Sequence, residues 1–340
     1  MQLPFPELAV LRVSLAYEFY KPDLPDSFLG GSVPRLRHLD LFSVSFPGLP
    51  NLLLSATHLV HLGLFRTPYS GYISPEAMAN CLSVLTSLEE IYFHHFEPSS
   101  DQESRRPLPP TRSVLPALTD FGFKGISEYF EDFVSRIDAP RLYRLSIMLF
   151  DNVQVDTPEL KQFISRLPRF GASNEAHLIY NDDGALFRLQ SQPDHGMVEV
   201  KVLCREPVRP FSSLMQICTL ALHPLLTTDN LYLEGSRFPL LLRTRGIENT
   251  VWLDLLLPFT AVKNLYLSEA FWPRIAPALQ ELAGGRTTEV LPALQNVLLE
   301  GFQPSEPVQE GIAEFISARQ LTNHPVAISV WDRNRGHGVR

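Results

Sequence analysis

Along the chain, apolar and polar residues return in one repeated arrangement. The unit is a Pro, Thr or other small residue, any residue, an aliphatic residue, two variable residues, an aliphatic residue, one variable residue and a further aliphatic residue. It reads PRLRHLDL from Pro34, THLVHLGL from Thr57 and PALQNVLL from Pro292. Because successive residues of a strand point to opposite faces, the end of this unit predicts a strand with one buried face and one open face.

Eight copies of the unit align on their first aliphatic residue. These anchors are Leu8, Leu36, Leu59, Leu88, Leu118, Leu142, Val262 and Leu294. Intervals among the first six run from 23 residues, between Leu36 and Leu59, to 30 residues, between Leu88 and Leu118. Leucine-rich repeats have periods of roughly 20–29 residues and contribute one strand each. The spacing therefore predicts a leucine-rich-repeat solenoid, and a set of unrelated amphipathic strands is the alternative.

Between the strands, the apolar residues change to helical spacing. Thr157 can cap a helix that has Pro158 at its first position, and apolar residues from Leu160 to Leu167 then share one face. Similar segments lie at 74–85, 127–137, 247–257, 272–283 and 307–319. One strand–helix unit cannot bury its own apolar face, so neighbouring units must stack. We therefore expect an α/β fold, a single leucine-rich-repeat solenoid over residues 1–340. It would be a horseshoe like that of ribonuclease inhibitor, with a curved parallel sheet and irregular outer helices.

Two regions depart from the regular pattern. Residues 170–245 contain strand-like segments at 177–180, 187–189 and 198–204, with a hairpin turn predicted at 181–184. A helix near 211–222 and a strand at 231–235 could then restore the repeat. We interpret 170–245 as irregular repeats rather than a second domain. Residues 98–112, PSSDQESRRPLPPTR, predict a polar, proline-rich loop.

The variable positions between the strand leucines would point to the concave face of such a horseshoe. The candidate partner-binding residues there are His38, Asp40, His61, Glu90, Tyr92, His94, Asp120, Arg144, Asn264, Tyr266 and Asn296. Exposed aromatic residues on a binding face are candidate hot spots. Tyr92 and Tyr266 could equally belong to the core. For Phe42 and Phe65 we favour packing into loops as part of the core.

Charge and composition limit the kind of partner. The net charge of -8 and the pI near 5.7 argue against nucleic acid, which needs a basic stripe. Three widely separated cysteines, Cys81, Cys204 and Cys218, favour a reducing compartment over a disulfide framework. The most apolar stretch is short and contains Asp254, and the first residues lack the pattern of a secretory signal. We expect an intracellular, cytoplasmic or nuclear, protein that binds another protein and neither nucleic acid nor membrane.

Candidate chemistry is sparse. The histidines at 58, 61, 94 and 95 suggest a metal site, but no Cys, Asp or Glu accompanies them along the chain at ligand spacing. The segment Gly284 to Thr288 lacks the Gly-Lys-Ser/Thr ending of a phosphate loop, and no Gly-x-Ser-x-Gly elbow is present. We therefore expect no metal, no cofactor and no enzymatic activity.

Several segments give the chain a resemblance to a known family. They are 123–150, 156–170, 247–268 and 274–321, the last reading RIAPALQELAGGRTTEVLPALQNVLLEGFQPSEPVQEGIAEFISARQL. The chain resembles the leucine-rich-repeat region of the F-box proteins that are expanded in mushroom-forming (basidiomycete) fungi. The likeness covers about residues 115–335 well and the first hundred residues more loosely.

The resemblance implies substrate recognition for a cullin–RING ubiquitin ligase, in which the F-box binds a Skp-type adaptor and the repeats hold the target. The chain departs from this pattern because it contains no F-box. Leu3-Pro4 and Glu7-Leu8 are similar to the opening of an F-box, but they already belong to the first repeat. We expect a Skp-type adaptor as a partner only if an F-box lies upstream. The alternative is an interaction scaffold unrelated to ubiquitin.

Overall fold

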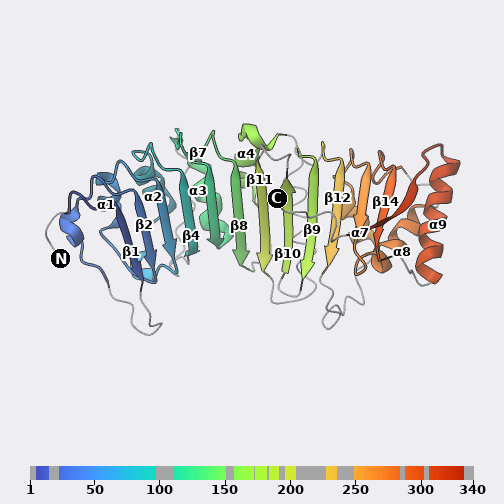
Figure 1. Ribbon diagram of the computed structural model, residues 1–340, viewed down its shortest axis with the longest axis horizontal. Coiled ribbons are helices and arrows are strands. Elements are labelled where there is room, and N and C mark those ends of the chain that lie inside the picture. The colour runs from blue at the N-terminus through green and yellow to red at the C-terminus, as the bar shows by residue number, and fades with distance from the viewer. Residues whose placement is uncertain are drawn as a thin grey trace. The chain divides into compact units, whose positions relative to one another are not determined.

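The chain divides into two compact units, Met1–Phe170 and Gly171–Arg340, and each is described by itself. Figure 1 draws the helices and strands of both units. The structure is a computed structural model. It describes residues 5–14, 23–96, 111–150, 157–171, 173–181, 184–190, 196–203, 227–235, 249–283, 288–301 and 306–332. Most of the predicted loop at 98–112 and the predicted helix near 211–222 lie outside these residues.

Six parallel strands form the sheet of the first unit. In chain order they are β1 (Val10–Ser14), β2 (His38–Phe42), β3 (His61–Phe65), β4 (Glu90–Phe96), β6 (Asp120–Gly125) and β8 (Arg144–Phe150), and each pairs with the next. The first residue of every strand lies opposite the first residue of its neighbour, as His38 does with His61. Two short strands, β5 (Ser113–Val114) and β7 (Ile137–Asp138), pair separately. This shared register is what stacked repeats require.

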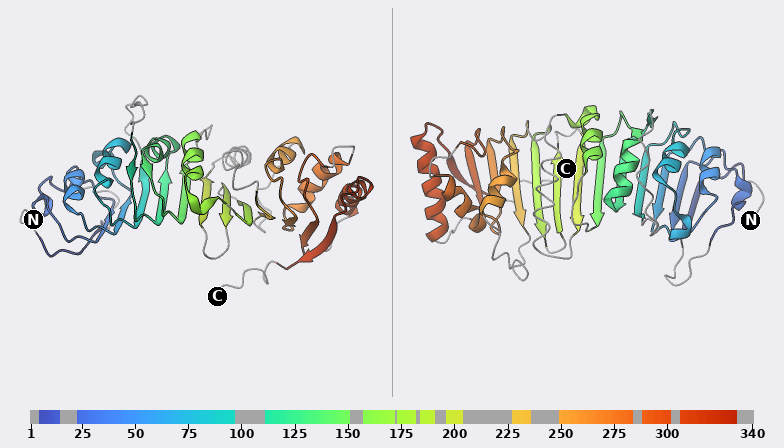
Figure 2. Two further views of the ribbon diagram at one scale, coloured as in Figure 1. Left: turned by 90° about the horizontal axis from the view of Figure 1, so that it is seen from above. Right: turned by 180° about the vertical axis from the view of Figure 1, so that it is seen from behind.

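Helices cover one side of this sheet (Figure 2). They are α1 (Leu49–Ser55), α2 (Pro75–Leu82), α3 (Ser127–Ser135) and α4 (Pro158–Ser165), with 3-10 turns at Phe28–Gly31, Tyr69–Gly71 and Pro168–Phe170. The helix predicted after Thr157 is confirmed, but the capping role of that residue is wrong, because its side chain makes no capping hydrogen bond. Instead the backbone N–H groups of Glu159 and Leu160 donate to the Glu131 carboxylate of α3. A carboxylate from the neighbouring repeat thus satisfies the positive end of α4.

The core of the first unit lies between sheet and helices. The anchors Leu36, Leu59, Leu88, Leu118 and Leu142 are fully buried, as the repeat predicts. Beside them a cluster of phenylalanines fills the middle of the unit, and Phe93, on β4, contacts Phe133, on α3, with ring centroids 5.6 Å apart. Burial of such large apolar side chains is the main favourable term in the folding of this unit.

The sheet of the second unit begins with an antiparallel part. β10 (Gly184–Gln190) lies between β11 (Met197–Leu203) and β9 (Glu175–Asn181), antiparallel to both. The hairpin predicted at 181–184 is confirmed, because Asn181 pairs with Gly184. On the other side of β9 the strands are parallel again and follow in the order β12 (Asn230–Gly235), β13 (Asn264–Leu267), β14 (Asn296–Glu300) and β15 (Ala327–Trp331).

Three described helices belong to the second unit: α7 (Asn249–Leu256), α8 (Trp272–Leu282) and α9 (Glu306–Leu321). All three were predicted from apolar spacing. A buried arginine links α9 to the preceding repeat by hydrogen bonds. The Arg319 guanidinium donates to the backbone carbonyls of Leu291, Pro292 and Leu294. Among the described helices, none is both long enough and apolar enough to cross a membrane. The α/β fold, with a mainly parallel sheet and one strand per repeat, is confirmed.

Candidate binding face

Each sheet has one side that faces away from the helices, here called the open face. Along the repeat strands the leucines are buried, and the alternate side chains lie on the open face, as the burial alternation in β8 shows. In the first unit the open face carries all eight candidates predicted there, from His38 to Arg144. In the second it carries Asn264, Tyr266 and Asn296. Whether they bind a partner stays a prediction.

A row of ionisable side chains crosses the first unit at the first position of five of its six parallel strands, β2 to β8. The row is His38, His61, Glu90, Asp120 and Arg144, each directly opposite the next. The imidazole rings of His38 and His61 are stacked, with centroids 4.0 Å apart. Nδ1 of His61 lies 2.8 Å from a carboxylate oxygen of Glu90, and Arg144 forms a 3.4 Å ion pair with Asp120. The row therefore contains a His61–Glu90 contact and an Asp120–Arg144 ion pair, and the two acids Glu90 and Asp120 lie opposite each other between them.

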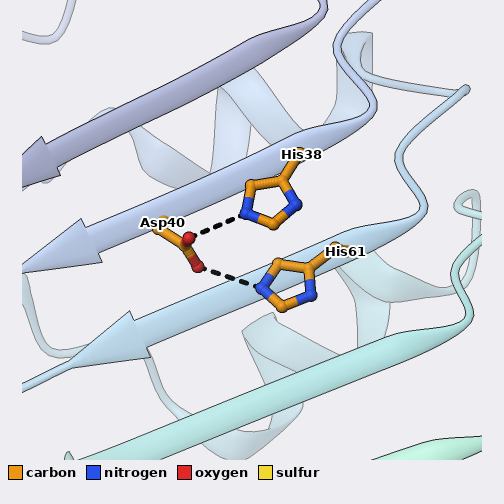
Figure 3. Close-up of side chains that lie close together, drawn as sticks. All are labelled: His38, Asp40 and His61. Carbon is orange, nitrogen blue, oxygen red and sulfur yellow. Dashed lines mark hydrogen bonds and ion pairs between the residues drawn. The ribbon is translucent and has the colours of Figure 1, made fainter.

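Asp40 is the centre of a second group, two residues further along β2. Its Oδ2 lies 2.7 Å from Nε2 of His38 and 3.2 Å from Nε of Arg12, and its Oδ1 lies 3.0 Å from Nε2 of His61 (Figure 3). The Asp40 side chain is only 9% exposed, whereas that of Arg12 is 65% exposed. A carboxylate this deeply covered needs the donors that surround it.

Two glycines on the open face, Gly63 and Gly122, leave space for side chains of neighbouring residues. A Cβ atom at Gly63 would meet the Asp40 carboxylate and the Phe65 ring, and one at Gly122 would lie 2.5 Å from Cδ1 of Tyr92. Tyr92 therefore lies over the backbone of the next strand. Its pKa is raised by burial and by the negative charges of Glu90 and Asp120, so its hydroxyl stays protonated and can donate a hydrogen bond.

Aromatic side chains form a third row on the same face. The rings of Phe42 and Phe65 are stacked with centroids 4.3 Å apart, and Phe65 meets the His94 ring edge-on at 4.9 Å. Phe42 is 37% exposed. The favoured interpretation of Phe42 and Phe65 as core residues is therefore wrong, because both belong to the open face.

In the second unit, a ladder of side-chain amides occupies the strand position that the ionisable row occupies in the first unit. The Asn264 side-chain amide donates to the side-chain oxygen of Asn230 at 2.8 Å, and that of Asn296 donates to Asn264 at 2.7 Å. These three residues occupy the first position of β12, β13 and β14. Their amides are largely satisfied by each other.

A stack of rings runs beside the amide ladder. The His177 ring stacks on Tyr232 at 4.3 Å, Tyr232 stacks on Tyr266 at 4.2 Å, and Trp331 packs edge-on against Tyr266 at 5.4 Å. Burial raises the pKa of the Tyr232 hydroxyl, and the nearby charge of Glu175 adds to the effect. The ring of Tyr266 is therefore in contact with protein on two sides.

His177 and Glu234 form a buried charged pair at the end of this stack. Nδ1 of His177 lies 2.9 Å from a carboxylate oxygen of Glu234, and both side chains are almost fully buried. Burial by itself would lower the pKa of His177. The bonds and charges of Glu175 and Glu234 outweigh this effect and raise the pKa above its ordinary value, which favours the imidazolium form.

The sequence did not predict several participants or one grouping. The participants are Arg12, His177, Asn230, Tyr232, Glu234 and Trp331. Arg12 lies in the first aligned repeat, PELAVLRV, at the position that Asp40 has in the second repeat. Asn230 and Tyr232 could have been found by extending the alignment to TDNLYL. His177 and Trp331 lie outside the recognised repeats. The statement that no carboxylate accompanies the histidines at ligand spacing is wrong for His61, because neighbouring strands supply Asp40 and Glu90. Both carboxylates adjoin His61 across the sheet and not along the chain.

Comparison with known proteins adds little to this geometry. No protein-family model and no curated protein matches the chain. Four chains among the solved structures match, and one is the leucine-rich repeat-containing protein LegL7 from Legionella pneumophila. It is 14% identical over 90% of each chain, with a TM-score of 0.34. A TM-score this low does not establish a common fold, so the fold assignment rests on the strand register and the buried anchors of this chain.

Proposed function

We propose that this chain is a protein-binding repeat module and that the open face of its first unit is the main contact surface for the partner. The observation that carries the proposal is the row of ionisable side chains from His38 to Arg144. Five consecutive repeat strands place five ionisable side chains side by side, on the face that no described helix covers. The proposed role is binding without chemistry on the partner.

The composition of this face fits a protein partner. Carboxylates, cations and aromatic rings alternate within a few ångströms, and a folded protein surface presents the same mixture. Tyr and Arg are the residue types that most often dominate interface energies. Tyr92 and Arg144 lie on β4 and β8 and are the proposed anchors. Asn264, Asn296 and Tyr266 are proposed as secondary contacts, because their side chains already contact one another or neighbouring rings.

A capture experiment with matched variants tests this proposal. The full chain is immobilised, bound proteins are identified by mass spectrometry, and the capture is repeated with the double variant Tyr92→Ala, Arg144→Ala. The control is Lys161→Ala, Gln162→Ala, which changes two exposed residues on the helix side of the same unit. We expect the open-face variant to lose its specific partner by about tenfold or more, as hot-spot loss implies. Equal capture by both variants would rule out this face.

We propose further that the module recognises substrates for an F-box-type ubiquitin ligase. The support is the resemblance carried by residues 123–150, 156–170, 247–268 and 274–321. The first measurement is to map the 5′ end of the transcript and translate the sequence upstream of Met1. If an F-box-like segment is found, the extended chain should copurify with a Skp-type adaptor and the chain as given should not. An immediate upstream stop codon would favour the stand-alone scaffold.

A further inference from the structure

The group of His38, Asp40 and His61 has the features of a metal site. One ligand atom from each residue lies within 4.8 Å of the others. Both imidazole rings reach toward the Asp40 carboxylate, which lies between them on the open face (Figure 3). The three residues come from two adjacent strands, β2 and β3, whose pairing is fixed by the sheet. The backbone therefore holds the donors together before any ion binds.

The nitrogens of this group lie close to shared carboxylate oxygens. Both nitrogens of His61 face carboxylates, of Glu90 at 2.8 Å and of Asp40 at 3.0 Å. Nε2 of His38 lies 2.7 Å from Asp40 and 3.2 Å from a guanidinium nitrogen of Arg12. One nitrogen of each imidazole and the Asp40 carboxylate therefore lie close enough together for one cation to bind all three.

We propose that Nε2 of His38, Nε2 of His61 and a carboxylate oxygen of Asp40 bind a divalent first-row transition-metal ion, and that Zn²⁺ fits this donor set best. Two imidazoles and one carboxylate form an N/O donor set of the kind Zn²⁺ takes, with a fourth position open to solvent. Ca²⁺ and Mg²⁺ take oxygen ligands and do not fit.

The surroundings of the ligands support the proposal. Metal-bound histidines usually donate their second N–H to a carboxylate, which fixes the ring and its tautomer. Glu90 stands in this position toward Nδ1 of His61. The side chains of His38 and His61 are 24% and 16% exposed, so an ion can reach them from solvent.

The required movement is small. Zinc bonds of about 2.0–2.1 Å at tetrahedral angles place ligand atoms roughly 3.4 Å apart. The ligand atoms here lie within 4.8 Å of one another, so side-chain rotation of the two histidines can close the remaining gap.

Arg12 opposes the ion and therefore provides the sharpest test. Its guanidinium pairs with the same Asp40 carboxylate, so metal and arginine compete. Because Arg12 is mostly exposed, Arg12→Gln should fold normally and bind Zn²⁺ several-fold more tightly than the natural chain. If the group is only a hydrogen-bonded cluster, removing Arg12 produces no tighter Zn²⁺ binding. The direction of this change thus separates a metal site from a salt-bridge cluster.

The experiment is Zn²⁺ titration calorimetry on the full chain after removal of metal with a chelator. We expect Asp40→Asn, and His38→Gln with His61→Gln, to lose at least tenfold in affinity, and Glu90→Gln to lose about tenfold through its effect on His61. The matched control is His58→Gln, an exposed histidine of the same unit, which should bind as the natural chain does. Binding to other histidines alone would give the same affinity in Asp40→Asn as in the natural chain, and that result would overturn the proposal.

A second readout distinguishes the loss of metal binding from the loss of the fold. Co²⁺ replaces Zn²⁺ and reports its ligands by visible absorption, and added Zn²⁺ should raise the melting temperature of any variant that binds it. We expect both effects in the natural chain and in Arg12→Gln, and neither in Asp40→Asn. If Arg12→Gln has the melting temperature of the natural chain in metal-free buffer and shows no Co²⁺ band, the proposal is overturned. Loss of the metal site and loss of partner capture by Tyr92→Ala, Arg144→Ala are independent outcomes.

Discussion

The two units use the same strand positions for different purposes. In the first unit, the leading position of the strands from β2 to β8 carries histidines and charged residues whose side chains are partly exposed to solvent. In the second, it carries three asparagines that bond mainly to each other. In both units, the leucines of the repeat strands are buried. The comparison shows that the register of a repeat sheet constrains one face strongly and leaves the other free to vary.

The units also differ in how they bury charge. Asp40, in the first unit, has three basic neighbours, Arg12, His38 and His61. In the second unit, Glu234 is buried against His177, and His177 is itself buried. A charge with several partly exposed partners tolerates the loss of one of them, whereas the loss of one member of a buried pair leaves the other charge away from water. The two open faces should therefore respond very differently to the removal of a single histidine.

The largest expected effect is that of His177→Ala. Removing one partner of a buried pair typically costs about 3–5 kcal/mol, because the remaining charge is left poorly compensated. The matched change in the first unit, His38→Ala in metal-free buffer, should cost about 1 kcal/mol, since Asp40 keeps Arg12 and His61. Urea unfolding measures both. Similar losses in the two variants would remove the distinction between the units.

A smaller effect is expected in the amide ladder. Asn264→Ala removes the donor to Asn230 and the acceptor for Asn296, and should cost about 1–2 kcal/mol for the two hydrogen bonds. Asn296→Ala removes only the second bond and should cost about half as much. Equal costs at the two positions, measured by thermal unfolding, would mean that the ladder adds no stability of its own.

The pH dependence of stability should also differ between the units. The raised pKa of His177 means that its protonation stabilises the folded state. That contribution is complete below the unfolded pKa of about 6.5 and is lost as the pH rises through the folded pKa. From about pH 6.5 upward, the natural chain should lose unfolding free energy relative to His177→Gln. Urea unfolding at several pH values tests this, and parallel curves for the two proteins would contradict it.

The smallest effect on stability is expected from Gly122→Ala. The new Cβ meets the Tyr92 ring, a side chain that can rotate away, so the cost should stay below about 1 kcal/mol. Capture of the partner should nevertheless weaken, because the ring no longer lies in its place. Gly63→Ala meets two side chains at once and should cost more than Gly122→Ala. A normal capture level in Gly122→Ala would show that the position of Tyr92 does not matter.

The sequence predicts the fold of this chain better than its site. Leucine spacing identifies the buried face, because burial acts on every repeat alike, and the helices at 74–85 and 272–283 follow from the same principle. Contacts across the open face depend on which residues neighbouring strands place opposite each other. The pairing of His61 with Asp40 and Glu90 joins residues 21 and 29 positions apart, and only the register reveals it. The reversed strand β10 follows from a hairpin turn, which the leucine pattern does not encode.

The antiparallel strands β9, β10 and β11 bear on how such a chain can evolve. Where strands run parallel in one register, a whole repeat can be duplicated or deleted and the neighbours still meet in the same direction. Around β10 this freedom is lost, because removing one strand would reverse the direction of everything that follows it. Strands can be gained or lost there only in pairs. Changes in repeat number should therefore accumulate on either side of this triplet, with the triplet itself inherited intact.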